Sequence, residues 1–142
     1  MTPNHITNYI LAATSAVIIP YLIMLAFWLH GPNVLTLVGA IIAISSLMPL
    51  IVARVQLGKS FSLTPQATEL VTTGLYSRIR HPVYVFAQLM LLGLVLCFWR
   101  FQLLLLWVLL LILQIARSHR EEKVLEETFG DSYREYREKT WF

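Results

Sequence analysis

The sequence predicts an all-α, polytopic membrane protein with about four transmembrane helices and an amphipathic cytoplasmic helix at its C-terminal end. Two observations lead to this prediction. Of the 142 residues, 57% are hydrophobic and only 13% are charged, whereas an average soluble domain has about 25% charged residues. The apolar residues also gather into runs long enough to cross a bilayer. A single domain, residues 1–142, is expected.

The first two apolar runs are each long enough to form a span. Residues 6–29 contain no charged side chain, and at about 1.5 Å per residue they exceed a hydrocarbon core of about 30 Å. A short turn at His30–Asn33 leads into the second span, residues 34–57. Gly39 and Ala43 give this span a small-residue face that favours close helix packing.

Two shorter apolar runs predict a helical hairpin. Residues 58–81 form the one long loop, and the runs 83–98 and 101–116 follow it. A single helix over both runs would be longer than about 50 Å, too long for one crossing. We therefore expect two spans joined by a tight turn at Trp99-Arg100, with both side chains at the membrane interface.

The remaining residues, 117–142, are expected to form a cytoplasmic tail. Apolar and aromatic residues recur in it at helical spacing, which predicts an amphipathic helix. These residues are Leu125, Phe129, Tyr133 and Tyr136. Gly130 is a point where this helix is expected to break.

The distribution of basic residues predicts the orientation. Four spans place the N-terminus, the 58–81 loop and the tail on one side. That side receives ten of the eleven basic residues, all except Arg100. The positive-inside rule then puts both termini in the cytoplasm, in the plasma (inner) membrane if the source is prokaryotic. The net charge of +3 is too small to suggest nucleic acid as a partner.

An antiparallel hairpin brings two polar segments together. His81 and Pro82 begin the third span, and Glu121 and Glu122 follow the fourth by little more than one turn. Pro82 suits the first turn of a helix. The amides of that turn, the helix dipole and Arg80 favour a carboxylate or phosphate.

Other side chains near these segments suggest what a ligand would carry. Glu121 can accept hydrogen bonds from a diol or an amine, and the rings of Tyr76 and Tyr84 attract a cation. A ligand with a carboxylate, a ribose diol and a positive centre would satisfy all of them. S-adenosylmethionine is such a ligand, although these residues alone permit it without singling it out.

Two separated motifs resemble those of the isoprenylcysteine carboxyl methyltransferase family and of the related phospholipid methyltransferases. The first motif is Leu70-Val71-Thr72-Thr73-Gly74-Leu75-Tyr76 followed by Arg80-His81-Pro82-Val83-Tyr84. The second is Arg117-x-x-x-Glu121-Glu122-x-x-Leu125-x-x-x-Phe129-Gly130-x-x-Tyr133-x-x-Tyr136. The resemblance covers about half of the chain, residues 57–136, and the distance between the two motifs also matches.

The resemblance implies an integral-membrane methyltransferase with a cytoplasmic S-adenosylmethionine site. It implies that this cofactor is held by Thr68, Glu69, Leu70, Val71, Tyr76, His81, Pro82, Val83, Tyr84 and Glu121. It further implies that Arg117 faces the methyl acceptor. The family often has histidine in place of Thr68 and usually glycine in place of Phe86, whose ring would narrow the path of a lipophilic acceptor.

The chemistry expected is alignment of the acceptor with an already electrophilic methyl group, so no metal and no specific catalytic residue is assigned. The acceptor stays open between an isoprenylcysteine-like carboxylate, a lipid amine and a small thiol. The lipid bilayer is the other expected partner. The oligomeric state is open, and the small-residue face of the second span makes a dimer conceivable.

Three other functional classes fit parts of the pattern. A small four-span transporter of cations would match the size, but such transport generally needs an acid within the membrane, and the four runs contain no Asp or Glu. A membrane sterol-type reductase would need further spans. A non-catalytic membrane assembly factor is distinguished only by assays of activity or binding.

Overall fold

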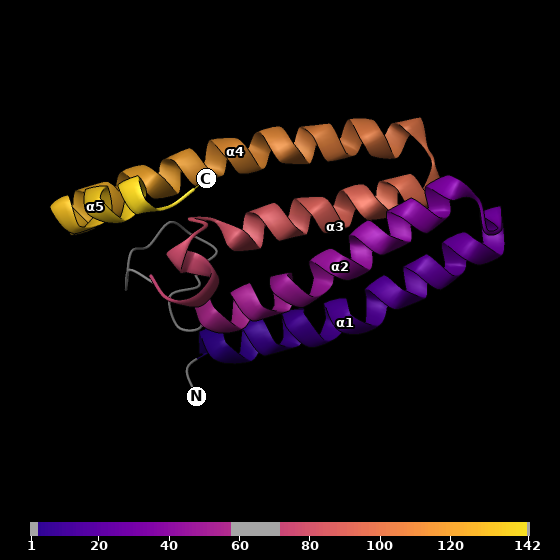
Figure 1. Ribbon diagram of the computed structural model, residues 1–142, viewed down its shortest axis with the longest axis horizontal. Coiled ribbons are helices and arrows are strands. Elements are labelled where there is room, and N and C mark those ends of the chain that lie inside the picture. The colour runs from indigo at the N-terminus through magenta and orange to yellow at the C-terminus, as the bar shows by residue number, and fades with distance from the viewer. Residues whose placement is uncertain (1–2, 58–71, 142) are drawn as a thin grey trace.

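A computed structural model describes residues 3–57 and 72–141 of the chain (Figure 1). In order, its elements are α1 (Pro3–His30), α2 (Val34–Leu57), the short 3-10 helix η2 (Gly74–Ser77), α3 (Pro82–Phe98), α4 (Phe101–Phe129) and α5 (Asp131–Lys139). Within the described ranges, the one β-bridge is an isolated parallel pairing of Ile79 with Trp141. The predicted all-α class is therefore confirmed.

Three of the helices are long and apolar enough to cross a membrane. They are the segment Tyr9–His30 of α1, α2 and α4. Large apolar side chains on all three are exposed, for example Trp28, Ile41 and Leu105, as expected where lipid covers a helix. The chain is thus an integral membrane protein. The fourth predicted span is α3, an apolar helix of 17 residues, which extends about 26 Å.

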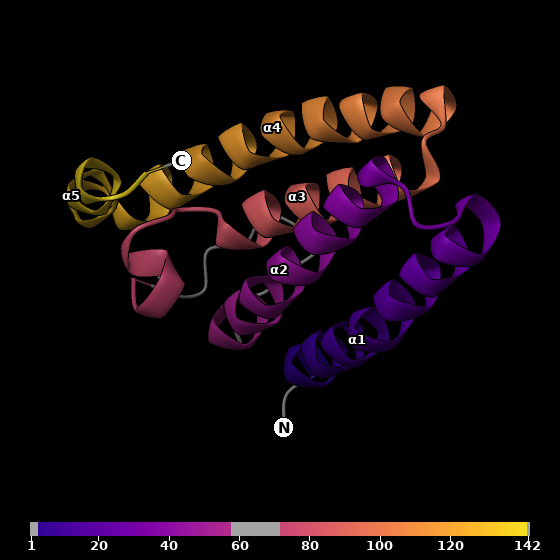
Figure 2. The same cartoon turned by 45° about the vertical axis from the view of Figure 1, so that its right-hand side comes forward.

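The helices lie side by side in the order of the chain. Figure 2 shows α1, α2, α3 and α4 in succession, each antiparallel to the one before. The start of α1, the end of α2, the start of α3 and the end of α4 therefore share one end of the molecule (Figure 1). This end carries both polar segments that the sequence predicts to be neighbours.

The closest packing is between α2 and α3, where two glycines face each other. A Cβ atom on Gly39 would lie 2.5 Å from the carbonyl oxygen of Gly93, and one on Gly93 would lie 2.6 Å from the amide of Ala43. These helices therefore touch backbone to backbone, and the small-residue face predicted for Gly39 and Ala43 is confirmed. The apolar core lies next to this glycine contact. It is formed by buried side chains of α1, α2 and α3, for example Ala26, Leu50 and Leu94.

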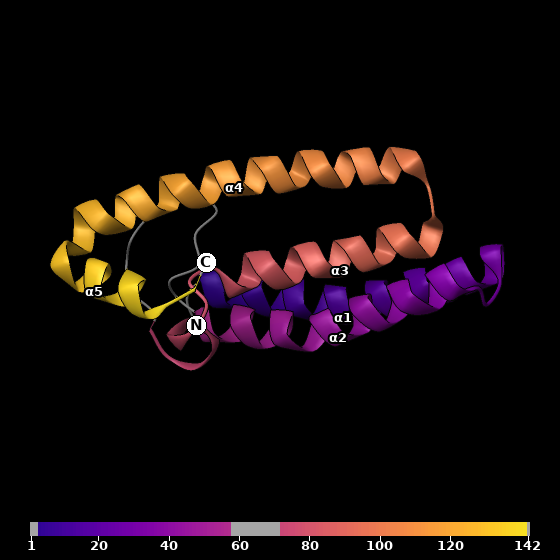
Figure 3. The same ribbon diagram turned by 45° about the horizontal axis from the view of Figure 1, so that its top comes forward.

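The tail differs from its predicted form. The sequence predicted a separate amphipathic helix after residue 116, but α4 runs without interruption to Phe129. Residues 117–129 are rich in Arg, Glu, Lys and Leu, which favour helix, and none of them breaks it. Gly130, with φ of +51°, ends α4, and α5 turns back along the end of α4 (Figure 3). The predicted aromatic face is therefore divided between two helices.

Candidate functional site

The start of α3 meets the polar turns near the C-terminal end of α4 through side-chain hydrogen bonds. Tyr84 Oη donates to Glu121 Oε1 over 2.6 Å, between residues 37 apart in the sequence. Arg80 Nη1 donates to Glu122 Oε1 over 2.8 Å, between residues 42 apart. The predicted proximity of the His81-Pro82 segment to the two glutamates is confirmed.

Glu121 is the centre of the first of two charged groups at this site. Arg117 Nε, one turn earlier on α4, also donates to Glu121 Oε1, over 3.0 Å. The Arg117 guanidinium lies 6.0 Å from the centroid of the Tyr84 ring, within the range of a cation–π contact. The cation-attracting face predicted for Tyr84 is therefore occupied by Arg117 in this structure.

Glu122 is the centre of the second charged group. Besides its bond to Arg80, Glu122 Oε1 lies 3.4 Å from His81 Nε2, and the His81 ring stacks on Tyr84 with centroids 5.5 Å apart. Burial lowers the pKa of His81, and the carboxylates of Glu122 and Glu121 only partly oppose this shift. His81 is therefore mostly neutral at pH 7, so Glu122 has Arg80 as its cationic partner.

The segment before α3 is fixed by one turn. Gly74 has φ of +64°, and a Cβ atom there would collide with the side chain of Gln56. The same Gln56 accepts a 2.9 Å hydrogen bond from the amide of Leu75 through Oε1. The glycine of the first motif is thus required by its backbone conformation, and the Gln56 side chain of α2 lies against it.

The C-terminal segment of the described chain closes over the turn before α3. Tyr136 Oη donates to the carbonyl oxygen of Tyr76 over 2.7 Å. The Trp141 amide donates to the Arg78 carbonyl over 2.7 Å, and the Arg80 amide donates to the Trp141 carbonyl over 3.0 Å. These contacts hold the peptide unit that presents the Arg80 side chain to Glu122.

Two sequence expectations need correction at this site. The amides of the first turn of α3 were expected to receive an anion, but one of them, that of Tyr84, donates to the His81 carbonyl over 3.0 Å. Tyr76 was expected to offer an aromatic face, but its side chain is only 6% exposed. Its role in this structure is packing, together with its carbonyl bond to Tyr136.

The remaining predicted cofactor residues fall into two groups. Pro82 is buried at the start of α3, and Val83 packs against the apolar core, as does Phe86. Thr68, Glu69, Leu70 and Val71 lie outside the described residues. Among the described residues, no group of three or more His, Cys, Asp or Glu side chains is arranged to hold a metal ion.

A polar pair inside the helical hairpin was not predicted. Gln88 Nε2 on α3 donates to Gln114 Oε1 on α4 over 2.8 Å. Trp107 Nε1 donates to the backbone carbonyl of Gln88 over 3.1 Å. The side-chain oxygen of Gln88 is buried and has no hydrogen-bond partner among the described residues, which costs about 1–3 kcal/mol. The signal available in the sequence was the presence of glutamines, Gln88, Gln102 and Gln114, within otherwise apolar runs.

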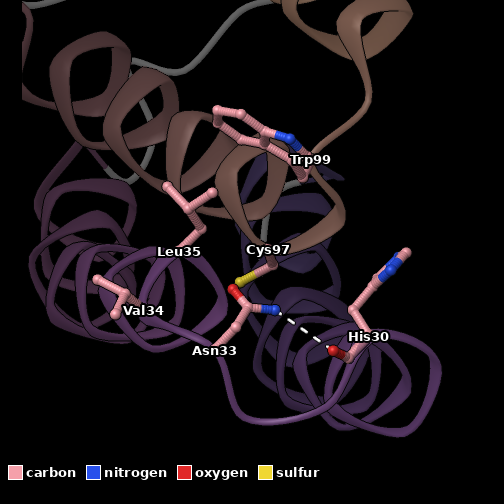
Figure 4. A pocket seen from close by; sticks show the side chains of 6 residues that line it. All are labelled: His30, Asn33, Val34, Leu35, Cys97 and Trp99. Carbon is pink, nitrogen blue, oxygen red and sulfur yellow. Dashed lines mark hydrogen bonds between the residues drawn. The ribbon is translucent and has the colours of Figure 1, made fainter.

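A separate pocket lies at the opposite end of the helices. It has a volume of about 420 Å³ and is lined by His30, Asn33, Val34, Leu35, Cys97 and Trp99 (Figure 4). Asn33 begins α2 there, donating to the His30 carbonyl over 3.3 Å and accepting from the Thr36 amide over 3.0 Å. None of the residues of the charged groups lines this pocket.

The chain was compared with known proteins. The family model described as phospholipid methyltransferase matches residues 28–132, which include α2, α3, α4 and all the residues of both charged groups. No curated protein matches the chain.

Proposed function

The chain belongs to the phospholipid methyltransferase family, and from this premise we propose that it transfers a methyl group from S-adenosylmethionine to a membrane-associated acceptor. Membership makes the chain a methyltransferase of a family that acts on lipid-type substrates. The cofactor, the site and the acceptor are the parts that we propose. The observation that supports them best is the convergence of Tyr84 and Arg80 on the adjacent glutamates Glu121 and Glu122.

We also propose a topology for this single domain. Three helices are long enough to span, and α3 serves as the fourth crossing because it is apolar and lies antiparallel to α2 (Figure 2). The end that carries Arg80, Glu121 and Glu122 is then cytoplasmic by the positive-inside rule. Both termini lie on that side.

The residues of the site fit S-adenosylmethionine. Tyr84 and Arg117 both donate to the same oxygen of Glu121, Oε1, so a ribose diol would approach Oε2. Arg80, whose partner Glu122 is partly exposed, suits the ligand's carboxylate. The face of the Tyr84 ring attracts cations. The positively charged sulfonium of the ligand would take the place that the Arg117 guanidinium has on this ring. Thr68, Glu69, Leu70 and Val71 remain predicted contacts of the same ligand.

When bound, S-adenosylmethionine supplies an electrophilic methyl group on its sulfonium. The chain contributes position: the helical hairpin fixes Tyr84 against Glu121, and His81, held neutral by burial, adds no positive charge beside the cation. Apolar helices exclude water from the path of the acceptor. Alignment of the acceptor with the methyl group is then the main contribution to rate.

Arg117 is the proposed contact on the acceptor side. It is half-exposed, with 39% of its side chain accessible, and its guanidinium bridges the Glu121 carboxylate and the Tyr84 ring. A ligand that takes the face of Tyr84 would displace this guanidinium toward the acceptor. Its charge suits a phosphate or carboxylate of a lipid.

The test is calorimetric binding of S-adenosylmethionine to the detergent-purified chain, with Glu121→Gln and His81→Ala in parallel. Glu127→Gln is the matched control, because Glu127 is exposed on the same helix. We expect the wild type and the control to bind equally and both site variants to bind at least about tenfold more weakly. A folded wild type that does not bind S-adenosylmethionine would refute the proposed cofactor.

A further inference from the structure

We propose that the phenol of Tyr133 on α5 binds the carboxylate of the cofactor together with Arg80, so that α5 completes the cofactor site. The inference rests on the proposed function and adds to its site a residue that the sequence motifs did not assign to cofactor binding. It starts from two buried polar atoms, Tyr133 Oη and Arg80 Nε. Neither atom has a hydrogen-bond partner within the part of the chain that the structure describes.

The return of α5 places Tyr133 beside Arg80 and Glu122. Gly130 ends α4, and α5 turns back along the end of α4 (Figure 3). Tyr133, in the first turn of α5, is only 1% exposed. Two residues after α5, the Trp141 carbonyl accepts a hydrogen bond from the Arg80 amide. The same returning segment therefore carries Tyr133 and holds the backbone of Arg80.

The phenol of Tyr133 is a hydrogen-bond donor at neutral pH. Burial raises the pKa of Tyr133, the Glu122 carboxylate adds to this rise, and the Arg80 guanidinium opposes it. Because the pKa lies above its ordinary value, the proton stays on the phenol oxygen. A buried donor without an acceptor is unfavourable, so an acceptor oxygen supplied by a ligand would be bound strongly here.

Arg80 offers a second donor to the same ligand. Glu122 Oε1 accepts from Nη1 of Arg80, whereas Nε–H has no acceptor among the described residues. A carboxylate has two oxygens and room for several donors, so it can accept from a guanidinium and from a phenol together. The side chains of Arg80 and Glu122 are 19% and 24% exposed, which gives the end of a ligand a way to this pair.

The two donors select one end of S-adenosylmethionine. Its carboxylate is an anion, whereas its sulfonium and its ammonium are cations that a guanidinium repels. The ribose and the sulfonium are already assigned to Glu121 and Tyr84. With the carboxylate at Arg80 and Tyr133, the ammonium on the neighbouring carbon would lie near the partly exposed Glu122 carboxylate, an acceptor of the opposite charge.

The experiment compares two ligands that differ in this one group. They are S-adenosylmethionine and its decarboxylated form, which keeps the sulfonium, the ribose and the amine. Calorimetry on the detergent-purified chain gives the ratio of the two affinities. We expect the wild type to prefer S-adenosylmethionine by about a hundredfold, because two donors reach the carboxylate. Tyr133→Phe should reduce this preference to about tenfold, through weaker binding of S-adenosylmethionine alone.

Tyr136→Phe is the matched control, because it removes a phenol hydroxyl from the same helix. The partner of that hydroxyl is the Tyr76 carbonyl, and the backbone bonds of Trp141 still hold the segment in this variant. The ratio of affinities should therefore stay within about twofold of the wild type. A purely structural role of Tyr133, such as holding a buried water, would change both affinities together in Tyr133→Phe.

Separate outcomes overturn the assignment and the proposed function. An unchanged ratio in a folded Tyr133→Phe variant that still binds S-adenosylmethionine would refute the role of Tyr133 alone. An equal fall of the ratio in Tyr136→Phe would refute it too, because it would show that loosening of α5 is sufficient. A folded wild type that binds neither ligand would refute the proposed cofactor, and the assignment of Tyr133 with it.

Discussion

The phenol of Tyr84 donates a 2.6 Å hydrogen bond to Glu121, which lies 37 residues further along the chain. This bond joins the first turn of α3 to the part of α4 that continues beyond its apolar segment. A second bond, from Arg80 to Glu122, lies beside it. The two bonds join the two segments where the proposed cofactor site lies, so we expect changes in them to act on binding more than on folding.

Tyr84→Phe tests this distinction. The change removes the hydroxyl and keeps the ring that stacks on His81. We expect S-adenosylmethionine affinity to fall by about tenfold, since a hydrogen bond to a charged group contributes about 1.5–3 kcal/mol. Calorimetry gives the affinity. Tyr21→Phe, at an exposed position of α1, should have no effect, and equal affinities for all three proteins would contradict the prediction.

Gly93→Ala tests the contact between α2 and α3. The added methyl group would lie 2.6 Å from the Gly39 carbonyl oxygen and the Ala43 amide, and backbone atoms yield less readily than side-chain ends. We expect a loss of about 1–3 kcal/mol in the free energy of unfolding, measured by denaturant titration in detergent. Ala16→Leu, a larger increase at an exposed position, is the control. Unchanged stability in Gly93→Ala would show that the helices are further apart.

The titration of His81 gives a pH dependence. Burial lowers its pKa below 6.5 in the folded chain, so between that lower value and pH 6.5 the unfolded chain binds more protons. Stability from this group is therefore present above about pH 6.5 and decreases as the pH falls through this window. We expect unfolding titrations to show a steeper decrease below pH 6.5 for the wild type than for His81→Asn. Parallel pH profiles for the two proteins would exclude a depressed pKa at His81.

Tyr136→Phe tests the closure by the C-terminal segment. It removes the 2.7 Å bond to the Tyr76 carbonyl, a net loss of about 0.5–1.5 kcal/mol. We expect faster hydrogen exchange at the Trp141 and Arg80 amides, which pair with the neighbouring backbone, and no change along α2. Ser132→Ala, at an exposed position of α5, should exchange like the wild type. Unaltered exchange in Tyr136→Phe would show that the segment is held by other contacts.

Much of the architecture was predictable because hydrophobic runs and turn residues are local signals. The second helix has the predicted bounds, Val34–Leu57, and the Trp99-Arg100 turn separates α3 from α4. The predicted proximity of the His81-Pro82 segment to Glu121 and Glu122 needed only the antiparallel hairpin. The end of the fourth span was mistaken for a helix boundary, because a membrane edge changes polarity without interrupting the backbone of α4.

Other features of the site depend on tertiary packing and were not predictable from spacing. The hydrogen bond from Tyr136 to the Tyr76 carbonyl depends on the return of α5, which the sequence suggested only as a break at Gly130. The engagement of the Tyr84 amide by the His81 carbonyl is a detail of backbone conformation. The pairing of Gln88 with Gln114 requires the rotation of each helix about its axis, which uniformly apolar runs leave undetermined.

The glycine contact between α2 and α3 has a mechanical consequence. Because these helices touch through backbone atoms at Gly39 and Gly93, sliding one past the other would force main-chain atoms together. The contacts between α3 and α4 at Gln88, Tyr84 and Arg80 are made by longer side chains, which can lengthen by rotamer changes. We therefore expect α2 and α3 to stay together as a rigid pair, and any widening that admits a lipid to come from an outward swing of α4.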